Sequence, residues 1–167
     1  MEEQITTGAV GRKYGLIFGL ISAMIFIGSA AARLDLGFAG IPISWGVVIT
    51  ALVLACKNFK AENGGFMSFG QGFSVSMWVT FIGGIVRSVL QYVYVMIDPD
   101  YMDFLKEQRA NQSFGPAPDP NQPVPDWVEF FNTAEFLVIA SIISAIFAGL
   151  IFGAIVAAVT KNEAEEF

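Results

Sequence analysis

Residues 136–160, FLVIASIISAIFAGLIFGAIVAAVT, decide the fold, because they form a run of 25 residues without a charge. A helix of about 20 residues crosses the hydrocarbon layer of a membrane, which is about 30 Å thick. Inside that layer each backbone N–H and C=O needs a partner within the protein, and a helix supplies one. The polar and apolar alternation of a membrane-spanning β-strand is missing from this run. The run therefore predicts a transmembrane helix.

Three more stretches of the chain have the same character. They cover residues 14–32, 36–56 and 63–86, with 19, 21 and 24 uncharged residues, and the third stays apolar beyond Arg87 as far as residue 97. We therefore predict an all-α integral membrane protein that forms one domain over residues 1–167. Its bundle of four transmembrane helices is expected over residues 12–33, 40–57, 72–97 and 127–160.

The composition agrees with this class and excludes several functions. Apolar residues make up 54% of the chain and charged residues 14%, whereas soluble domains carry about 25% charged residues. Histidine is absent and Cys56 is the sole cysteine, which removes histidine general bases, Cys/His zinc sites and internal disulfides. With 9 basic and 15 acidic residues, the chain has no basic patch for nucleic acid. We expect no nucleic-acid partner.

The first apolar run also has the look of a secretory signal, with small residues at positions 28–32. It is longer than the usual apolar core of a signal peptide, and its N-terminus is acidic. We therefore expect a retained first helix and no cleavage.

The short loops indicate the orientation, because Lys and Arg are enriched on the cytoplasmic side. One side would carry five of these residues and the other side three, of which the last two lie within a loop rich in acids. The five are Arg12, Lys13, Lys57, Lys60 and Lys161, and the three are Arg33, Lys106 and Arg109. We expect both termini in the cytoplasm and residues 98–129 in the periplasm.

Residues 98–126 form the expected outer loop, which holds most of the prolines. Prolines recur through residues 116–125, and this pattern favours an extended, polyproline-like segment over a helix or a strand. Ahead of it, Asp98, Pro99 and Asp100 are typical of a helix start, since Asp caps a helix and Pro suits the first turn. The acids lack the spacing and the central glycine of a calcium loop.

Arg87 is the one charge deep within an apolar run. A charge near the middle of the membrane costs about 2.5–3.5 kcal/mol on insertion scales, so it normally faces other helices and has a partner. Glu135 is expected at a similar depth in the last helix. We predict an Arg87–Glu135 pair between helices three and four. As an alternative, Arg87 binds an anion or a lipid headgroup, or it extends along its own stem toward the interface.

Small residues recur every four positions in the first and the last apolar run. This spacing puts them on one helix face, where two backbones can approach closely. The first set is Gly11, Gly15, Gly19 and Ala23, and the second is Ser141, Ala145, Gly149, Gly153 and Ala157. We predict helix-packing faces, within the chain or against a second copy.

The second cytoplasmic loop combines glycines with aromatic residues. Gly64 and Gly65 predict a turn, and Phe66, Phe69 and Phe73 share one helical face. We predict a short interfacial element with its rings at the acyl boundary. The pattern argues against a phosphate-binding loop, because the Gly-Lys-Ser/Thr ending and a preceding strand are both absent. Cys56, at the end of the second helix, suits either burial as a small apolar group or palmitoylation.

Several of these stretches together resemble a known family. They are residues 14–19 (YGLIFG), 57–60 (KNFK), 63–73 (NGGFMSFGQGF) and 95–101 (VMIDPDY). The chain resembles the family catalogued as domain of unknown function 4199. The resemblance implies a small four-helix protein of the inner membrane of Gram-negative bacteria. It implies no activity and no catalytic residue.

The sequence thus favours a non-enzymatic structural or accessory subunit of a membrane assembly, with no cofactor and no metal. Its expected partners are membrane lipid and either further copies of the chain or other membrane proteins. The alternative is a small oligomeric transporter or channel that uses Arg87 as an intramembrane anion site. An enzyme acting on lipid-linked substrates would need more acids or metal ligands than residues 98–103 offer.

Overall fold

The computed structural model describes residues 5–112 and 126–162, with the side chains of residues 109–112, 126 and 127 left undescribed. This part of the chain is helical, apart from one isolated β-bridge between Met67 and Asn162. The elements are α1 (Thr7–Ala31), the 3-10 turn η1 (Gly37–Ala39), α2 (Gly40–Glu62), α3 (Phe69–Ile97), α4 (Asp100–Gln112), α5 (Asp126–Phe130) and α6 (Ala134–Thr160). Four helices, α1, α2, α3 and α6, are long and apolar enough to cross a membrane. The proline-rich residues 116–125 lie outside the described part.

Helix starts differ from the expected ones where a side chain caps the backbone. The first helix begins earlier than residue 12, because the Thr6 side chain accepts a hydrogen bond from the Ala9 N–H. The third begins at Phe69, behind a capping box in which Ser68 and Gln71 bond to each other's backbone N–H. The expected last helix from residue 127 is divided into α5 and α6, because Thr133 is extended and caps α6 through the Phe136 N–H.

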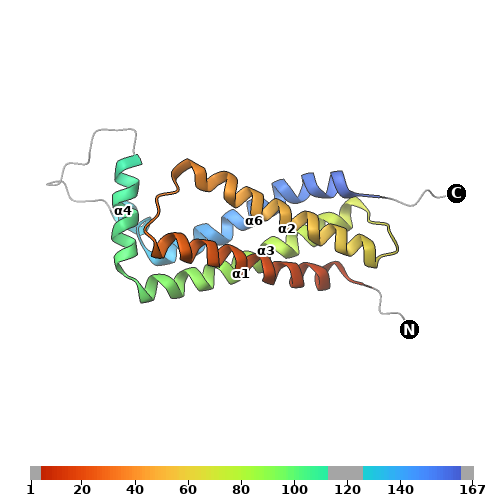
Figure 1. Ribbon diagram of the computed structural model, residues 1–167, viewed down its shortest axis with the longest axis horizontal. Helices are drawn as coiled ribbons and strands as arrows, with labels where there is room; N and C mark the ends of the chain where they lie inside the picture. The colour runs from red at the N-terminus through yellow and green to blue at the C-terminus, as the bar shows by residue number, and fades with distance from the viewer. Residues whose placement is uncertain (1–4, 113–125, 163–167) are drawn as a thin grey trace.

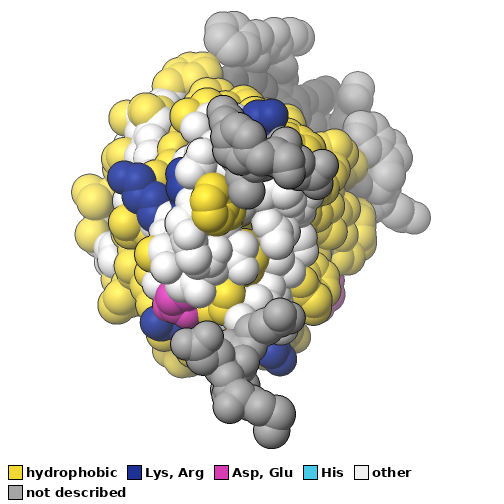
Figure 2. Space-filling view, turned by 90° about the vertical axis from the view of Figure 1, so that its right-hand side faces the viewer, with side chains coloured by type: hydrophobic (Ala, Val, Ile, Leu, Met, Phe, Trp, Pro, Cys, Tyr) yellow, Lys and Arg dark blue, Asp and Glu magenta, His cyan; other side chains and the backbone are white. Residues whose placement is uncertain are grey.

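The four long helices run side by side along the long axis, and α4 crosses one end of the bundle (Figure 1). We call this the α4 end, and α1 begins and α6 ends at the opposite end. Figure 2 looks onto the opposite end, where Lys and Arg side chains are scattered and apolar side chains cover the rim.

Helix α3 is the centre of the bundle, because the small-residue faces of both α1 and α6 pack against it. A Cβ at Gly15 would lie 2.9 Å from the Val79 carbonyl oxygen, so only glycine allows this approach of α1 to α3. Across α3, a Cβ at Gly153 would lie 2.8 Å from the Ser76 Cβ. Both stripes therefore have their partner within the chain.

Two neighbouring glycines of α3 serve opposite sides of the bundle. A Cβ at Gly83 would meet the Phe18 ring and the Gly15 carbonyl of α1, and a Cβ at Gly84 would lie 2.6 Å from the Ala145 Cβ of α6. In addition, the Ser141 hydroxyl of α6 donates a hydrogen bond of 2.7 Å to the Gln91 side-chain oxygen of α3.

The apolar core lies in the half of the bundle toward the opposite end. It is formed by the second half of α2 together with residues of α1, α3 and α6. Its members include Val10, Val48, Leu52, Cys56, Phe59, Met67, Val75, Val79 and Val156. No residue of α2 before Val48 is buried, so the first half of this helix stands away from the core.

The glycine–aromatic loop closes the opposite end. Gly64 and Gly65 have φ of +68° and +90°, which favours glycine, and the expected turn lies here. The chain then runs extended through Met67, which exchanges two backbone hydrogen bonds with Asn162 beyond α6. Phe69 and Phe73 stack with ring centroids 6.1 Å apart, and Phe66 is exposed. The loop is thus tied to the end of α6.

Candidate functional site

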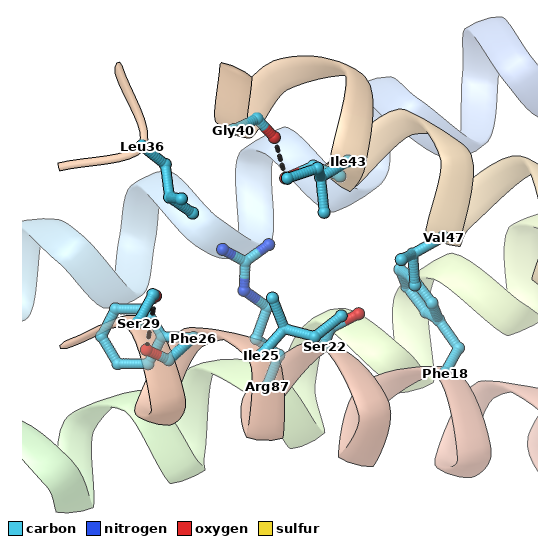
Figure 3. Close-up of a pocket in the computed structure, with 11 residues that line it drawn as sticks. Phe18, Ser22, Ile25, Phe26, Ser29, Leu36, Gly40, Ile43, Val47 and Arg87 are labelled. Atoms are coloured by element: carbon cyan, nitrogen blue, oxygen red, sulfur yellow. Dashed lines mark hydrogen bonds between the residues drawn. The ribbon is translucent and has the colours of Figure 1, made fainter. Parts of the chain in front are cut away.

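Arg87 lies on α3 and extends its guanidinium between α1 and α2 (Figure 3). It lines a cavity of about 120 Å³, the Arg87 cavity, between these helices. The walls are mostly apolar, with three hydroxyl groups among them. The lining residues are Phe18, Ser22, Ile25, Phe26, Ser29, Leu36, Gly40, Ile43, Ser44 and Val47. The Arg87 cavity exists because the first half of α2 does not pack into the apolar core.

A second cavity of about 160 Å³, the inner cavity, lies on the α6 side of the same arginine. It shares Phe18, Ser44 and Arg87 with the Arg87 cavity. Thr80 of α3 and Ser141 and Ser144 of α6 contribute further hydroxyl groups. Arg87 therefore stands at the junction of two small cavities whose polar lining consists of hydroxyl donors and acceptors.

The predicted Arg87–Glu135 pair is not formed. The two ion pairs among the described residues are Arg33–Asp98 and Lys106–Asp103. The Arg87 Nε atom is buried, and no described group accepts its proton. Glu135 lies instead beside a groove of about 440 Å³ between α3 and α6, which is lined almost entirely by apolar side chains such as Val89, Val93 and Ile139. Sequence reasoning placed the two residues at similar depth but could not fix their directions around the helix axes.

A guanidinium in such a cavity favours an oxyanion. Its N–H groups form a planar fork that matches a carboxylate or a phosphate. The hydroxyl groups of Ser22 and Ser144 can donate to the remaining oxygens, whereas the hydroxyl groups of Ser29, Ser44, Thr80 and Ser141 already donate within the protein and can only accept. No acidic residue is among the described residues that line either cavity. Among all residues that the structure describes, no group of three or more His, Cys, Asp or Glu could hold a metal ion. The arrangement can therefore bind an anion, and it offers no general base of its own.

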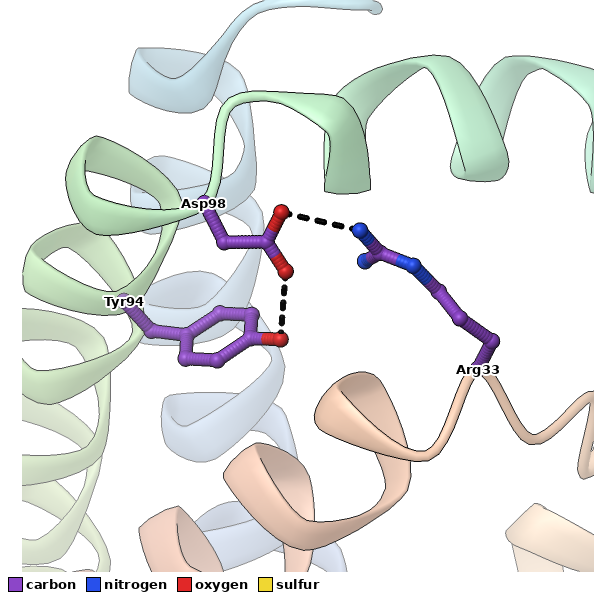
Figure 4. Close-up of polar contacts among 3 residues, drawn as sticks. All are labelled: Arg33, Tyr94 and Asp98. Atoms are coloured by element: carbon purple, nitrogen blue, oxygen red, sulfur yellow. Dashed lines mark hydrogen bonds and ion pairs between the residues drawn. The ribbon is translucent and has the colours of Figure 1, made fainter.

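The α4 end is fixed by a second polar cluster (Figure 4). Arg33, with a φ of +49° just after α1, donates a hydrogen bond of 2.8 Å from Nη2 to the Asp98 carboxylate. The Tyr94 hydroxyl donates a bond of 2.7 Å to the other Asp98 oxygen. The Arg33 guanidinium also lies 5.7 Å from the ring centroids of Tyr101 and Phe104 on α4. These contacts join the end of α1 to the α3–α4 junction.

The same contacts shift two pKa values outside the apolar helices. The hydrogen bonds from Arg33 and Tyr94 lower the pKa of the Asp98 carboxyl, and a bond from the Tyr101 backbone N–H adds to this. The Asp98 carboxylate raises the pKa of Arg33 in return. Asp98 caps the end of α3, and α4 begins at Asp100, so a helix does start at the predicted turn. The Asp98 carboxylate itself is bonded to Arg33 and Tyr94.

Sequence reasoning missed Arg33, Tyr94 and Gln91 as structural residues. Arg33 counted there only as a loop cation, although the expected topology puts it on the same side of the membrane as Asp98. Gln91 is a polar residue in an apolar run, and its burial beside Ser141 is the expected way to satisfy such a group. The polar character of Gln91 in an apolar run could have identified it, but sequence reasoning considered only the charged Arg87 in this run.

Comparison with known proteins gives one match. The model of a family described as "Protein of unknown function (DUF4199)" matches residues 13–162. No curated protein and no solved structure matches the chain.

Proposed function

The chain belongs to the DUF4199 family, whose function is unknown, and we propose from the structure that it is an inner-membrane protein. It binds an oxyanion at Arg87 and does not convert this ligand chemically. The observation that carries this proposal is the buried Arg87 Nε atom, which has no acceptor among the described residues and lies beside two hydroxyl-lined cavities. An unpaired charge at this depth is costly, and such residues are typical of functional sites. The ligand would be a carboxylate or a phosphate.

The membrane setting is part of the proposal. Four helices of sufficient length and apolarity support it, as do large apolar side chains exposed on their outer faces, such as Met24, Val89 and Val159. The Lys and Arg residues at the opposite end favour placing that end in the cytoplasm and α4 in the periplasm.

Substitution of Arg87 with Gln tests the site. A structural clamp would lose stability when Arg87 is removed, whereas a ligand site that carries an unpaired charge gains stability without ligand. We expect Arg87→Gln to raise the unfolding free energy by up to about 2.5–3.5 kcal/mol, the insertion cost of a central arginine. Thermal unfolding in phosphatidylcholine nanodiscs free of phosphate measures the difference.

Ligand binding gives the second readout. Addition of inorganic phosphate, acetate or phosphatidylglycerol is expected to stabilise the native protein, by about 1.4 kcal/mol at ten times the dissociation constant. Arg87→Gln is expected to abolish this stabilisation. Glu135→Gln is the matched control and should keep it, because Glu135 faces the groove away from the cavities. Stabilisation of the Arg87→Gln variant equal to that of the native chain would contradict the proposal.

A structural or accessory role is the second candidate, and one observation favours it. The turn η1 and the first half of α2 carry large exposed apolar side chains, with Phe38 of η1 83% exposed and Trp45 of α2 53% exposed. A photo-crosslinking residue at position 38 is expected to give a protein adduct of defined mass, and one at Val159 only lipid adducts. Lipid adducts alone at both positions would leave no support for this role.

Transport by a small oligomer, the alternative that the sequence raised, uses the same anion site. It requires a second opening toward the opposite end. Anion flux into liposomes that disappears in Arg87→Gln and persists in Glu135→Gln would favour transport over binding alone.

A further inference from the structure

A third cavity lies directly beneath α4. We call this space, of about 240 Å³, the α4 cavity. It is walled by the end of α1, by the loop before α2 and by one face of α4. The lining residues are Ser29, Ala30, Leu34, Leu36, Gly37, Tyr101, Phe104 and Gln108.

The three cavities follow one another from the α4 end to the centre of the bundle. The α4 cavity and the Arg87 cavity share Ser29 and Leu36 in their walls, so the two cavities adjoin at these side chains. The Arg87 cavity and the inner cavity share Phe18, Ser44 and Arg87. A solute beneath α4 therefore has a short route to the guanidinium.

The route ends where the apolar core begins. Val48 lines the inner cavity, and beyond it Leu52, Val79 and Cys56 are each 0% exposed. The core continues from there to Phe59 and Met67 near the opposite end. On α2, the described lining of the three cavities ends at Val48.

Arg87 is the cation along the route that has no ion-pair partner among the described residues, since Arg33 is paired with Asp98. Arg33 lies over the rings of Tyr101 and Phe104, which line the α4 cavity, and its Nη1 atom is buried without a hydrogen-bond partner. Arg87 stands at the inner end. The described lining of the three cavities contains no acid. Asp35 flanks the wall of the α4 cavity and accepts a hydrogen bond from the Gly37 N–H, and the nearby Asp98 carboxylate is held by Arg33 and Tyr94. This arrangement draws an anion inward and repels a cation.

We propose that the Arg87 site is loaded only from the α4 end, by a carboxylate or a phosphate group that passes beneath α4 and past Ser29. This inference rests on the proposed function and adds the route and the side of entry. The binding step is reversible and needs no reaction, since the anion leaves by the way it came.

Side-specific thiol labelling tests the route, and the native chain is its control. Cys56 is the sole cysteine and is fully buried in the apolar core, in the half of the bundle toward the opposite end, which we call the closed half. The native protein should therefore react with membrane-impermeant methanethiosulfonates from neither side. In a Cys56→Ala background, Ser29→Cys, Ser22→Cys and Ser144→Cys place a thiol in the lining of successive cavities, with Ser144 at the exposed edge of the inner cavity. Lys106→Cys and Lys57→Cys report which side of a vesicle is the α4 side, since both lysines are exposed.

We expect the three cavity thiols to react from the α4 side alone, with Ser29→Cys fastest and Ser144→Cys slowest. The anionic sulfonatoethyl reagent should react about tenfold or more faster than the cationic trimethylammonium-ethyl reagent. Addition of Arg87→Gln should remove this preference at Ser22→Cys and Ser144→Cys. Reaction of Ser144→Cys from the Lys57 side, at a rate equal to that from the α4 side, would overturn the inference.

Protection experiments separate the route from the site. Inorganic phosphate in phosphatidylcholine vesicles should slow labelling of Ser144→Cys if the ligand is free in solution, and phosphatidylglycerol without phosphate should slow it if the oxyanion is a lipid headgroup. Either result supports the site. Labelling from the α4 side without protection and without preference for the anionic reagent would contradict the proposed function. Labelling with protection but from the wrong side would contradict the route alone.

Discussion

The two halves of the bundle use the same four helices in different ways. Toward the opposite end, Leu52 and Phe59 of α2 fill the space between α1, α3 and α6 and are almost completely buried. Toward the α4 end, the first half of α2 contributes no buried residue, and cavities surround Arg87. The close packing of α1 and α6 against α3 holds in both halves. The difference between the halves is therefore made by α2.

This division separates stability from binding. Apolar side chains that fit closely stabilise the half near the termini, and such packing tolerates no buried unpaired charge. The half near α4 keeps Arg87 and several hydroxyl groups beside open space, which a site for a ligand requires. Substitutions that distinguish the halves should therefore differ in their effect on folding.

The largest effect is expected from removal of a core side chain of α2. Leu52→Ala leaves a cavity in the closed half and should lower the unfolding free energy by about 2–5 kcal/mol. Leu54 is the matched control on the same helix, since it is 49% exposed on the outer face. Thermal unfolding in nanodiscs measures both variants. Equal losses for Leu52→Ala and Leu54→Ala would mean that the two faces of α2 do not differ in packing.

A smaller effect is expected at the glycines of α1, one from each half. A Cβ at Gly15 would lie 2.9 Å from both the Ile82 Cβ and the Val79 carbonyl oxygen, so Gly15→Ala should destabilise by about 1–3 kcal/mol through overpacking. Gly28, on the same helix toward the α4 end, has nothing within 4 Å of such a Cβ. Gly28→Ala should stabilise by about 0.5–1 kcal/mol, because alanine is the better helix former.

The same measurement of thermal unfolding serves for this pair. The placement of α1 against α3 would be contradicted if Gly28→Ala lowered the stability, or if Gly15→Ala left the stability unchanged.

The smallest effect is expected at the α4 end and depends on pH. Hydrogen bonds from Arg33 and Tyr94 lower the pKa of Asp98 in the folded protein, so the stability from this carboxylate is present above its unfolded pKa of about 3.9. That stability is lost as the pH falls through the lowered pKa. Asp98→Asn should therefore be less stable than the native chain at neutral pH, and the difference should shrink as the pH falls below about 4.

Asp103→Asn is the control for Asp98→Asn. Asp103 pairs with Lys106 at 2.8 Å, but both side chains are half exposed or more, and such pairs contribute little. Unfolding of the three proteins between pH 3 and 7 gives the comparison. If the difference in stability between Asp98→Asn and the native chain stayed constant over this range, the charge of the Asp98 carboxylate would not contribute to stability.

Sequence reasoning reached the architecture because long apolar runs restrict it. Runs such as residues 136–160 have few alternatives to a helix, and all four expected helices are present. Small residues at four-residue spacing indicated which faces of α1 and α6 approach another helix. That α3 is the partner of both depends on tertiary packing, which one sequence does not specify.

The site was harder to predict than the fold. Arg87 stood out by its charge alone, but its partner depends on the rotation of each helix about its axis, and Glu135 turns toward a different face of the bundle. The Arg33–Asp98 pair joins loops separated by 65 residues, and no local pattern records it. The cavities arise from the departure of α2 from the core, which its uniformly apolar sequence does not indicate.

The adjacent glycines at positions 83 and 84 make the length of α3 intolerant of change. Each residue added to a helix turns everything beyond it by about 100°. One residue inserted just before Gly83 would rotate the following segment, including Arg87 and Gln91, away from the present neighbours on α1 and α6. In the first half of α2, where no side chain is buried, the same insertion would disturb the cavity lining but no residue of the apolar core. Length variation among related chains should therefore collect before residue 48 and be rare within α3.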